Sequence, residues 1–200
     1  MNQIFFLIGL LANGFLLIMM LASLNNKRFQ FWPPPSKNTW QYHSLWWSVR
    51  LIVVCIGGLI YLDNSNINIP HWLRFYIAMP GFIVTFLLGT IAAVQLGWSN
   101  THGVAEKFVA RGFYKYSRNP QYVFYSISFL LLGLWVASFK VLVLLLFLGV
   151  WYLCAPFPEE IWLEKQYGEK YLNYKKQVSR YFGRSGNTKS TLKQPTKNVD

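Results

Sequence analysis

The chain has 200 residues, of which 54% are hydrophobic and 13% are charged, and its formal net charge is +12. So many apolar and so few charged residues are untypical of a soluble globular domain and indicate one membrane domain. A nucleic-acid partner would require a basic face, and the basic residues form no recognisable one. We therefore expect no nucleic-acid partner.

Apolar runs long enough to cross a bilayer recur along the chain. They cover Ile4–Leu24, Leu45–Leu62, Leu73–Gly97, Tyr122–Phe139 and Val141–Pro156. The last two runs are short and almost contiguous, which predicts a tight helical hairpin. We therefore expect an all-α, polytopic membrane protein with about five transmembrane helices, a C-terminal hairpin and a cytoplasmic amphipathic helix.

The basic residues are distributed unequally between the loops that join these runs. All Lys and Arg residues except Arg74 and Lys140 fall in segments that would share one side of the membrane. Because basic loops stay in the cytoplasm, this pattern predicts an N-terminus outside and a C-terminus inside. The first run has no basic segment before it and no small-residue cleavage pattern, so we expect a retained span and not a signal peptide.

The loops before the third run show little that indicates chemistry. In the first loop, Asn25–Ser44, three prolines and several aromatic residues predict a stiff turn at the headgroup level, in preference to a partner-binding motif. The second loop, Asp63–His71, is a short polar turn without recognisable chemistry. Gln95, near the end of the third run, could either contact a ligand or make an interhelical hydrogen bond. The cysteine and histidine spacings fit no metal motif, so no metal is expected.

A charged and aromatic segment, Lys107–Tyr122, lies between the third and fourth runs. Asn119 is suited to the N-cap of a helix and Pro120 to its first position, and the backbone N–H groups of such a helix end attract anions. Arg118 adds a positive charge at the same place. Aromatic and cationic side chains in this segment would suit a ligand with a flat ring and charged ends.

A second polar element, Pro158-Glu159-Glu160, follows the last apolar run. Acidic residues here either complement the dipole of a new helix, or one of them faces inward to meet a cation. The next segment, Ile161–Phe182, has apolar residues at steps of three and four. It predicts an amphipathic helix, interrupted at Gly168, that lies on the membrane face or over the third loop.

The order and spacing of these pieces resemble the isoprenylcysteine carboxyl methyltransferase family and its phospholipid methyltransferase relatives, including bacterial members. The resemblance rests on Gly112–Tyr122 (GFYKYSRNPQY), a helical hairpin, Glu159-Glu160 and Gln166–Val178 (QYGEKYLNYKKQV). It covers about residues 98–182. It implies transfer of a methyl group from S-adenosylmethionine (SAM), without a metal, to a lipophilic acceptor such as an isoprenylcysteine-like carboxylate or a lipid.

The resemblance also implies which residues form the site. As residues of the catalytic centre it implies Arg118, Asn119 and Glu159. As residues that bind the cofactor it implies Lys107, Phe108, Val109, Tyr114, Asn119, Pro120, Gln121, Tyr122, Glu159 and Glu160. Membrane lipids are the expected partners. The chain would divide into N-terminal membrane helices (1–97), a SAM-binding catalytic region (98–182) and a disordered basic tail (183–200).

Two positions depart from the family pattern. Asn119 stands where the best-known members have histidine, and Ala155 stands where the isoprenylcysteine enzymes have an arginine for the substrate carboxylate. The methyl acceptor is therefore left open. Two alternatives remain: a nicotinamide-dependent isoprenoid or sterol reductase, whose members resemble this family but are longer, and a non-catalytic membrane protein.

Overall fold

The computed structural model describes residues 1–26, 29–63, 67–104 and 107–183, and within these ranges every regular element is helical. The long elements are α1 (Asn2–Asn25), α2 (Trp40–Leu62), η1 (Leu73–Ala78) continuing into α3 (Met79–Leu96), α5 (Pro120–Val136) and α6 (Phe139–Cys154). The shorter ones are α4 (Trp98–Thr101), η2 (Gly112–Lys115), α7 (Pro156–Tyr167) and α8 (Glu169–Gln177). The predicted all-α membrane fold is confirmed.

Four helical stretches of the described chain are long and apolar enough to cross a membrane. They are Asn2–Asn25, Trp40–Leu62, Leu73–Leu96 and Phe139–Tyr167. The fifth expected span is α5, which has only 17 residues. The last run was expected to end at Pro156, and α6 ends at Cys154, while α7 begins at Pro156 after Ala155, whose backbone conformation is α-helical. Proline is tolerated at Pro156 because it occupies the first turn of α7, where its missing N–H is not needed.

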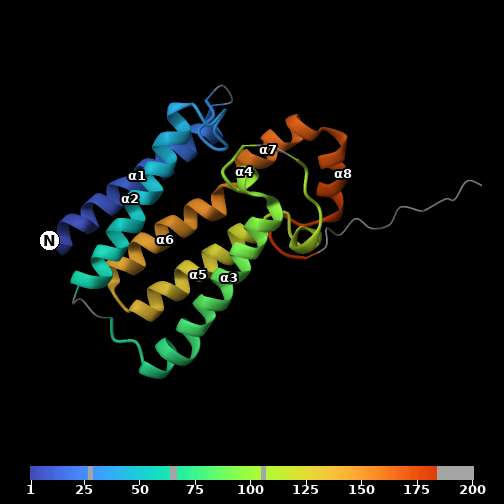
Figure 1. Cartoon of the computed structure of the whole chain (residues 1–200). Coiled ribbons are helices and arrows are strands. Elements are labelled where there is room, and N and C mark those ends of the chain that lie inside the picture. The colour runs from blue at the N-terminus through green and yellow to red at the C-terminus, as the bar shows by residue number, and fades with distance from the viewer. Residues whose placement is uncertain (27–28, 64–66, 105–106, 184–200) are drawn as a thin grey trace, which may run out of the picture.

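The helices pack side by side, with α3 against α5, α5 against α6, and α6 against α1, while α2 covers α1 (Figure 1). Small residues permit the close approaches that lipid-embedded helices need. A side chain at Gly89 would meet the ring of Tyr125 on α5 at 3.0 Å, and one at Gly133 would meet Leu142 on α6 at 2.6 Å. The short turn at Ala137 and Ser138 brings α6 back along α5, which is the predicted hairpin.

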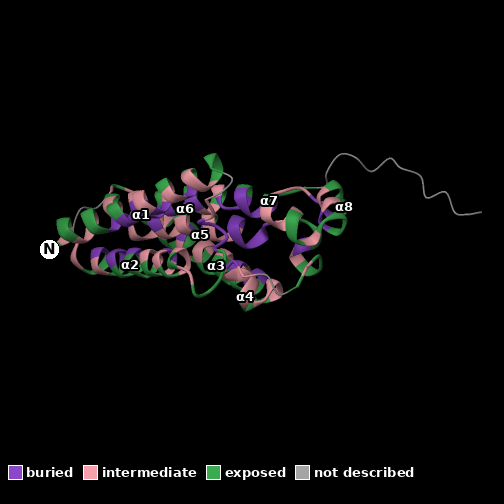
Figure 2. Ribbon diagram, turned by 90° about the horizontal axis from the view of Figure 1, so that it is seen from above, coloured by how far each residue is buried: buried purple, intermediate pink, exposed green. Residues whose placement is uncertain are grey.

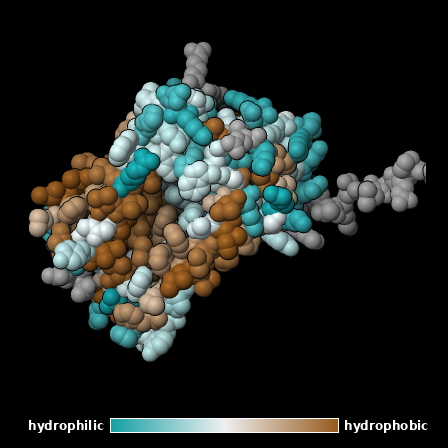
Figure 3. Space-filling view, viewed as in Figure 1, coloured by the Kyte–Doolittle hydropathy of each residue, from teal (hydrophilic) through white to brown (hydrophobic). Residues whose placement is uncertain are grey.

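Large apolar side chains remain exposed along the bundle, including Leu11 (73%), Val54 (61%) and Val94 (68%). The main buried cluster joins α1, α2 and α6, and buried residues continue into α5 and α7 (Figure 2). Apolar side chains gather over the long helices, and hydrophilic ones over the end that carries α7 and α8 (Figure 3). Because exposed aliphatic side chains on this scale are stable only in lipid, the bundle is the membrane-embedded part of the protein.

Asp63 fastens the end of the bundle that also holds the N-terminus. Its carboxylate accepts hydrogen bonds from Asn2, from Ser138 (2.6 Å) and from Lys140 (2.8 Å), so it joins α1, α2 and the hairpin turn. Nearby, the guanidinium of Arg74 donates to the backbone carbonyl of Trp135. The sequence indicated no role for Asp63, and its role here is structural. The opposite end of the bundle is therefore free to carry the polar segments.

Candidate active site

A pocket enclosing about 560 Å³, part of it open to solvent, lies between the third loop, the start of α5, and α7 and α8. The sequence-predicted residues that line it are Lys107, Phe108, Val109, Tyr114, Arg118, Asn119, Gln121, Tyr122 and Glu159. Pro120 and Glu160 do not line it: Pro120 is buried at the start of α5, and Glu160 faces an ion-pair cluster. Arg118 and Glu160 are 42 positions apart in the chain, and they meet as the sequence predicted for the cationic and acidic segments.

Glu159 is the acidic group of the pocket and is only 8% exposed. Both hydrogen bonds that it accepts converge on one oxygen: Oε2 receives the Tyr122 hydroxyl at 2.5 Å and the Trp32 indole N–H at 3.3 Å. Within the described residues, Oε1 has no hydrogen-bond partner. This oxygen is thus not engaged by the described part of the chain, whereas Oε2 is. The arrangement therefore presents one oxygen to a donor or cation placed in the pocket.

Further buried polar atoms of the pocket lining lack partners among the described residues. They are the hydroxyls of Tyr114 and Tyr171 and Oε1 of Gln121. Most buried polar atoms in proteins are hydrogen-bonded, so three such atoms around one cavity indicate a polar ligand. The two tyrosine hydroxyls can donate hydrogen bonds, and Oε1 of Gln121 accepts them. Together with the carboxylate of Glu159, these atoms suit a ligand that carries both hydroxyl and amino groups.

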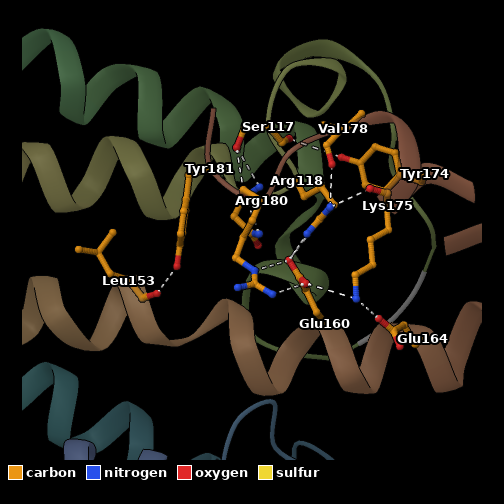
Figure 4. A network of polar contacts seen from close by, with 11 residues as sticks. Ser117, Arg118, Leu153, Glu160, Glu164, Tyr174, Lys175, Val178, Arg180 and Tyr181 are labelled. Atoms are coloured by element: carbon orange, nitrogen blue, oxygen red, sulfur yellow. Dashed lines mark hydrogen bonds and ion pairs between the residues drawn. The ribbon is translucent and has the colours of Figure 1, made fainter. Parts of the chain in front are cut away.

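Arg118 and Glu160 form the centre of an ion-pair cluster beside the pocket (Figure 4). Nε and Nη2 of Arg118 donate to Oε1 of Glu160 at 3.2 and 2.9 Å. Nη1 donates to the backbone carbonyls of Lys175 and Val178. Arg180 binds the same carboxylate through both its oxygens at 2.9 Å. These bonds fix the segment after α8 against α5 and α7.

Arg118 therefore has a different setting from the one the sequence suggested. We expected its charge to be available to an anionic ligand, but its guanidinium makes four hydrogen bonds within the protein. The side chain still lines the pocket. Its main contribution in this structure is to neutralise Glu160 and to hold the C-terminal segment in place, which makes it a positioning residue.

Asn119 caps the N-terminus of α5, and Pro120 occupies the first turn, as the sequence predicted. The side chain of Asn119 makes no capping hydrogen bond; its Nδ2 donates to the backbone carbonyl of Arg180 at 3.1 Å. The backbone N–H of Arg118 donates to the carbonyl of Ser179 at 3.0 Å. The start of α5 is thereby joined to the C-terminal segment along several residues, and this pairing closes one side of the pocket.

Aromatic residues of α7 and α8 cover the pocket. The ring of Phe108, from the third loop, lies 5.5 Å from Tyr167 and 5.4 Å from Tyr174 between centroids. The amphipathic element breaks at Gly168, where φ is +52°. Its aromatic residues therefore pack against the third loop, which is one of the two positions predicted for this element. The Tyr174 hydroxyl donates to the carbonyl of Tyr114 at 2.6 Å, and burial raises the pKa of Tyr174.

Two contributions were not predicted. Trp32 was expected in an aromatic belt at the headgroup level, which is wrong, because Phe31 and Trp32 are 0% and 3% exposed and Trp32 binds Glu159. Arg180 was not singled out, yet it is bound to Glu160. The prolines beside Trp32 were the available signal, since a rigid loop of aromatic residues can enter a core.

Gln95, which the sequence left open between two roles, accepts a hydrogen bond from the backbone N–H of Phe113 at 3.0 Å. The predicted tail, 183–200, lies outside the described residues except for Gly183.

Comparison with known protein families gives a match over the part of the chain that contains most of this site. Residues 73–170 match the model of the phospholipid methyltransferase family, and this segment runs from η1 through α7 and so includes the third loop, α5 and Glu159. No curated protein and no solved structure matches the chain. The match and the membrane-embedded helical fold point to a membrane methyltransferase. In its segment 73–170, the chain is therefore similar to the phospholipid methyltransferase family.

Proposed function

We propose that this protein is an integral membrane methyltransferase that takes its methyl group from SAM and transfers it to a lipophilic acceptor. The observation that supports this most strongly is the pocket beside Glu159. It combines an acidic oxygen without a partner, three further unpartnered polar atoms and aromatic walls, and it lies inside the segment that matches the family.

The residues of the pocket fit the chemistry of SAM, which has a flat base, ribose hydroxyls, an ammonium, a carboxylate and a sulfonium. Glu159 would accept from a hydroxyl or a cationic group through Oε1. Gln121 would accept through Oε1, and the hydroxyls of Tyr114 and Tyr171 would donate. Phe108 offers an aromatic surface next to the base. Lys107 supplies a cation for the carboxylate at the outer side of the pocket.

When bound, SAM supplies a methyl group on a positively charged sulfur that becomes neutral as the methyl group leaves. Catalysis of such a displacement consists mainly of alignment and exclusion of water. In this chain, Phe108, Tyr171 and Tyr174 form an aromatic cover that would limit the access of water. The pairing of Arg118 with Glu160 and with the carbonyls of Lys175 and Val178 holds that cover in place.

The orientation in the membrane follows from the charges. The pocket is at the end of the bundle that carries the first and third loops and α8, and these segments contain most of the 19 Lys and Arg residues. Basic segments are retained on the cytoplasmic side. We therefore place the pocket and the C-terminus in the cytoplasm, where SAM is available, and the N-terminus outside.

A methyl-transfer assay tests the proposal. The purified full-length protein is incubated in detergent with SAM that carries a labelled methyl group and with a total lipid extract, with and without excess S-adenosylhomocysteine. We expect labelled, organic-soluble product that disappears with the competitor. A parallel incubation with NADPH addresses the reductase alternative: oxidation of NADPH without label transfer would overturn the proposal, and so would absence of both activities and of S-adenosylhomocysteine binding.

A further inference from the structure

A second pocket lies next to the first, nearer the middle of the bundle. It encloses about 380 Å³ between the second and third turns of α2, the first two turns of α5, the last turn of α6, α4 and Trp32 of the first loop. Leu45 and Val49 form its aliphatic side, and Trp46, Tyr125, Trp151 and Tyr152 form its aromatic side. Because these are the terminal turns of membrane helices, the pocket sits where the headgroup region meets the lipid interior.

The lining of this second pocket has no charge. Among the described residues that line it there is no Asp, Glu, Lys, Arg or His. A phosphate or an ammonium buried here would have no opposite charge beside it, and an unpaired ion in an apolar site is strongly unfavourable. A zwitterionic phospholipid headgroup therefore does not fit this pocket.

Two indole N–H groups of the lining have no hydrogen-bond partner among the described residues. They belong to Trp46 and Trp151, and Trp151 is 4% exposed. An indole nitrogen only donates, so it can be satisfied by an oxygen of a ligand but not by an ammonium. The pocket thus combines flat aromatic walls with two buried donors, which suits a ring that bears an oxygen.

The two pockets share part of their walls, so their occupants would lie close to each other. Gln121 and Tyr122 line both. Tyr122 holds its hydroxyl against Oε2 of Glu159 at 2.5 Å. A group bound in the second pocket therefore faces the first pocket across a tyrosine hydroxyl that is already connected to a carboxylate.

We propose that the second pocket binds the methyl acceptor, and that the acceptor is an uncharged lipid whose polar end is a phenol-type hydroxyl; this rests on the function proposed above. The acceptor oxygen forms a bond to the methyl carbon while the carbon–sulfur bond breaks and its electron pair stays on sulfur. The hydroxyl proton passes to the Tyr122 oxygen as the tyrosine proton moves to Glu159. A carboxylate acceptor is disfavoured, because it would bring a second negative charge towards Glu159 without a cation in the lining.

The test uses the full-length chain in detergent, labelled SAM and three probes: 4-dodecylphenol, palmitate and phosphatidylethanolamine vesicles. We expect a labelled methyl ether from the phenol and little product from the other two. Trp151→Phe and Trp46→Phe each remove an N–H donor and should raise the KM for the phenol by roughly three- to tenfold, the effect of one hydrogen bond. Val49→Phe fills the pocket and should abolish transfer. Trp47→Phe, at an exposed neighbour on α2, should behave as wild type.

S-Adenosylhomocysteine binding is measured for each variant, since it reports folding and the first pocket independently of the second. Unchanged binding with a raised phenol KM supports the inference. The inference is overturned if the wild type prefers phosphatidylethanolamine or palmitate as acceptor. It is also overturned if folded Trp151→Phe and Val49→Phe show wild-type kinetics with the phenol. Either result leaves the proposed function standing. If the wild type binds no S-adenosylhomocysteine, the proposed function itself fails. If the variants do not fold, the preference of the wild type among the three probes decides.

Discussion

The hydroxyl of Tyr122 donates to Oε2 of Glu159 across 2.5 Å. Tyr122 lies in the first turn of α5 and Glu159 in the first turn of α7, so this bond joins two helix ends that are separated in the chain by the hairpin. Both side chains are almost completely buried. The bond fixes the orientation of the carboxylate and directs its other oxygen to the pocket.

Replacing Tyr122 with Phe removes this donor while keeping the ring. The carboxylate then loses one of its two hydrogen bonds, and we expect a loss of stability of about 1–3 kcal/mol together with weaker S-adenosylhomocysteine binding. Thermal unfolding in detergent and titration calorimetry measure the two effects. Tyr116→Phe, at a tyrosine that is 70% exposed, is the matched control. Equal behaviour of the two variants would show that the bond does not orient Glu159.

Replacing Glu160 with Ala should destabilise the protein more strongly, by about 3 kcal/mol, because it leaves Arg118 buried without its partner. The side chain of Arg118 is 8% exposed. The segment after α8 should also become accessible to proteolysis, since Arg180 loses its carboxylate partner. Glu169→Ala, an exposed glutamate in the first turn of α8, serves as control. Unchanged melting and unchanged cleavage would contradict the role given to this cluster.

Asp63→Ala separates stability from ligand binding. It breaks the ion pair with Lys140 and the hydrogen bond from Ser138 at the end of the bundle opposite the pocket. We expect a melting temperature lowered by several degrees and an S-adenosylhomocysteine affinity equal to wild type in the folded fraction. A selective loss of affinity, without loss of stability, would mean that the two ends are coupled in a way the structure does not show.

Gly112→Ala should perturb the third loop. Gly112 has φ of +62°, which disfavours any other residue, and an added Cβ would lie 2.2 Å from Oε1 of Gln95. The hydrogen bond from Phe113 to Gln95 would break, with a stability loss of about 1 kcal/mol or more. Gly57→Ala on α2 meets nothing within 4 Å and is the control. Equal melting temperatures for the two variants would refute this explanation of Gly112.

Buried tyrosines of the pocket should give the stability a dependence on alkaline pH. Burial raises the pKa of Tyr114, Tyr171 and Tyr174 above the ordinary value of about 10. The folded state keeps these protons when the unfolded state has lost them, so the stability is complete below about pH 10 and falls as the pH rises further. Tyr174→Phe should reduce this slope. Tyr116→Phe should not, because that side chain is exposed.

Local patterns were enough to predict the helices and part of the site. The lengths of the apolar runs predicted the long helices, and Gly168 marked the break between α7 and α8, where φ is positive. The N-cap position of Asn119 followed from residue preferences alone. The spacing of the third-loop motif and Glu159 predicted residues that the fold brings to one pocket.

Contacts between distant segments were not accessible to the same reasoning. Trp32 is 127 positions from Glu159, and its loop of prolines and aromatic residues does not reveal which helix ends it packs between. Arg118 was assigned to a ligand because the sequence does not reveal that the carbonyls after α8 return to it. Asp63 looked like an ordinary loop residue because its partners lie on α1 and on the hairpin turn. In each case the missing knowledge was which helix ends meet.

The affinity for S-adenosylhomocysteine of the Glu159→Gln variant, compared with that of Glu169→Gln, tests the central claim most directly. Gln keeps the size of the side chain but removes its charge, and Glu169 carries the same charge in an exposed helix turn. If Glu159 holds the donor through a desolvated oxygen, its replacement weakens binding by roughly tenfold or more, while Glu169→Gln binds as wild type. Equal affinities for wild type and both variants would show that Glu159 only complements the dipole of α7, and would contradict the account.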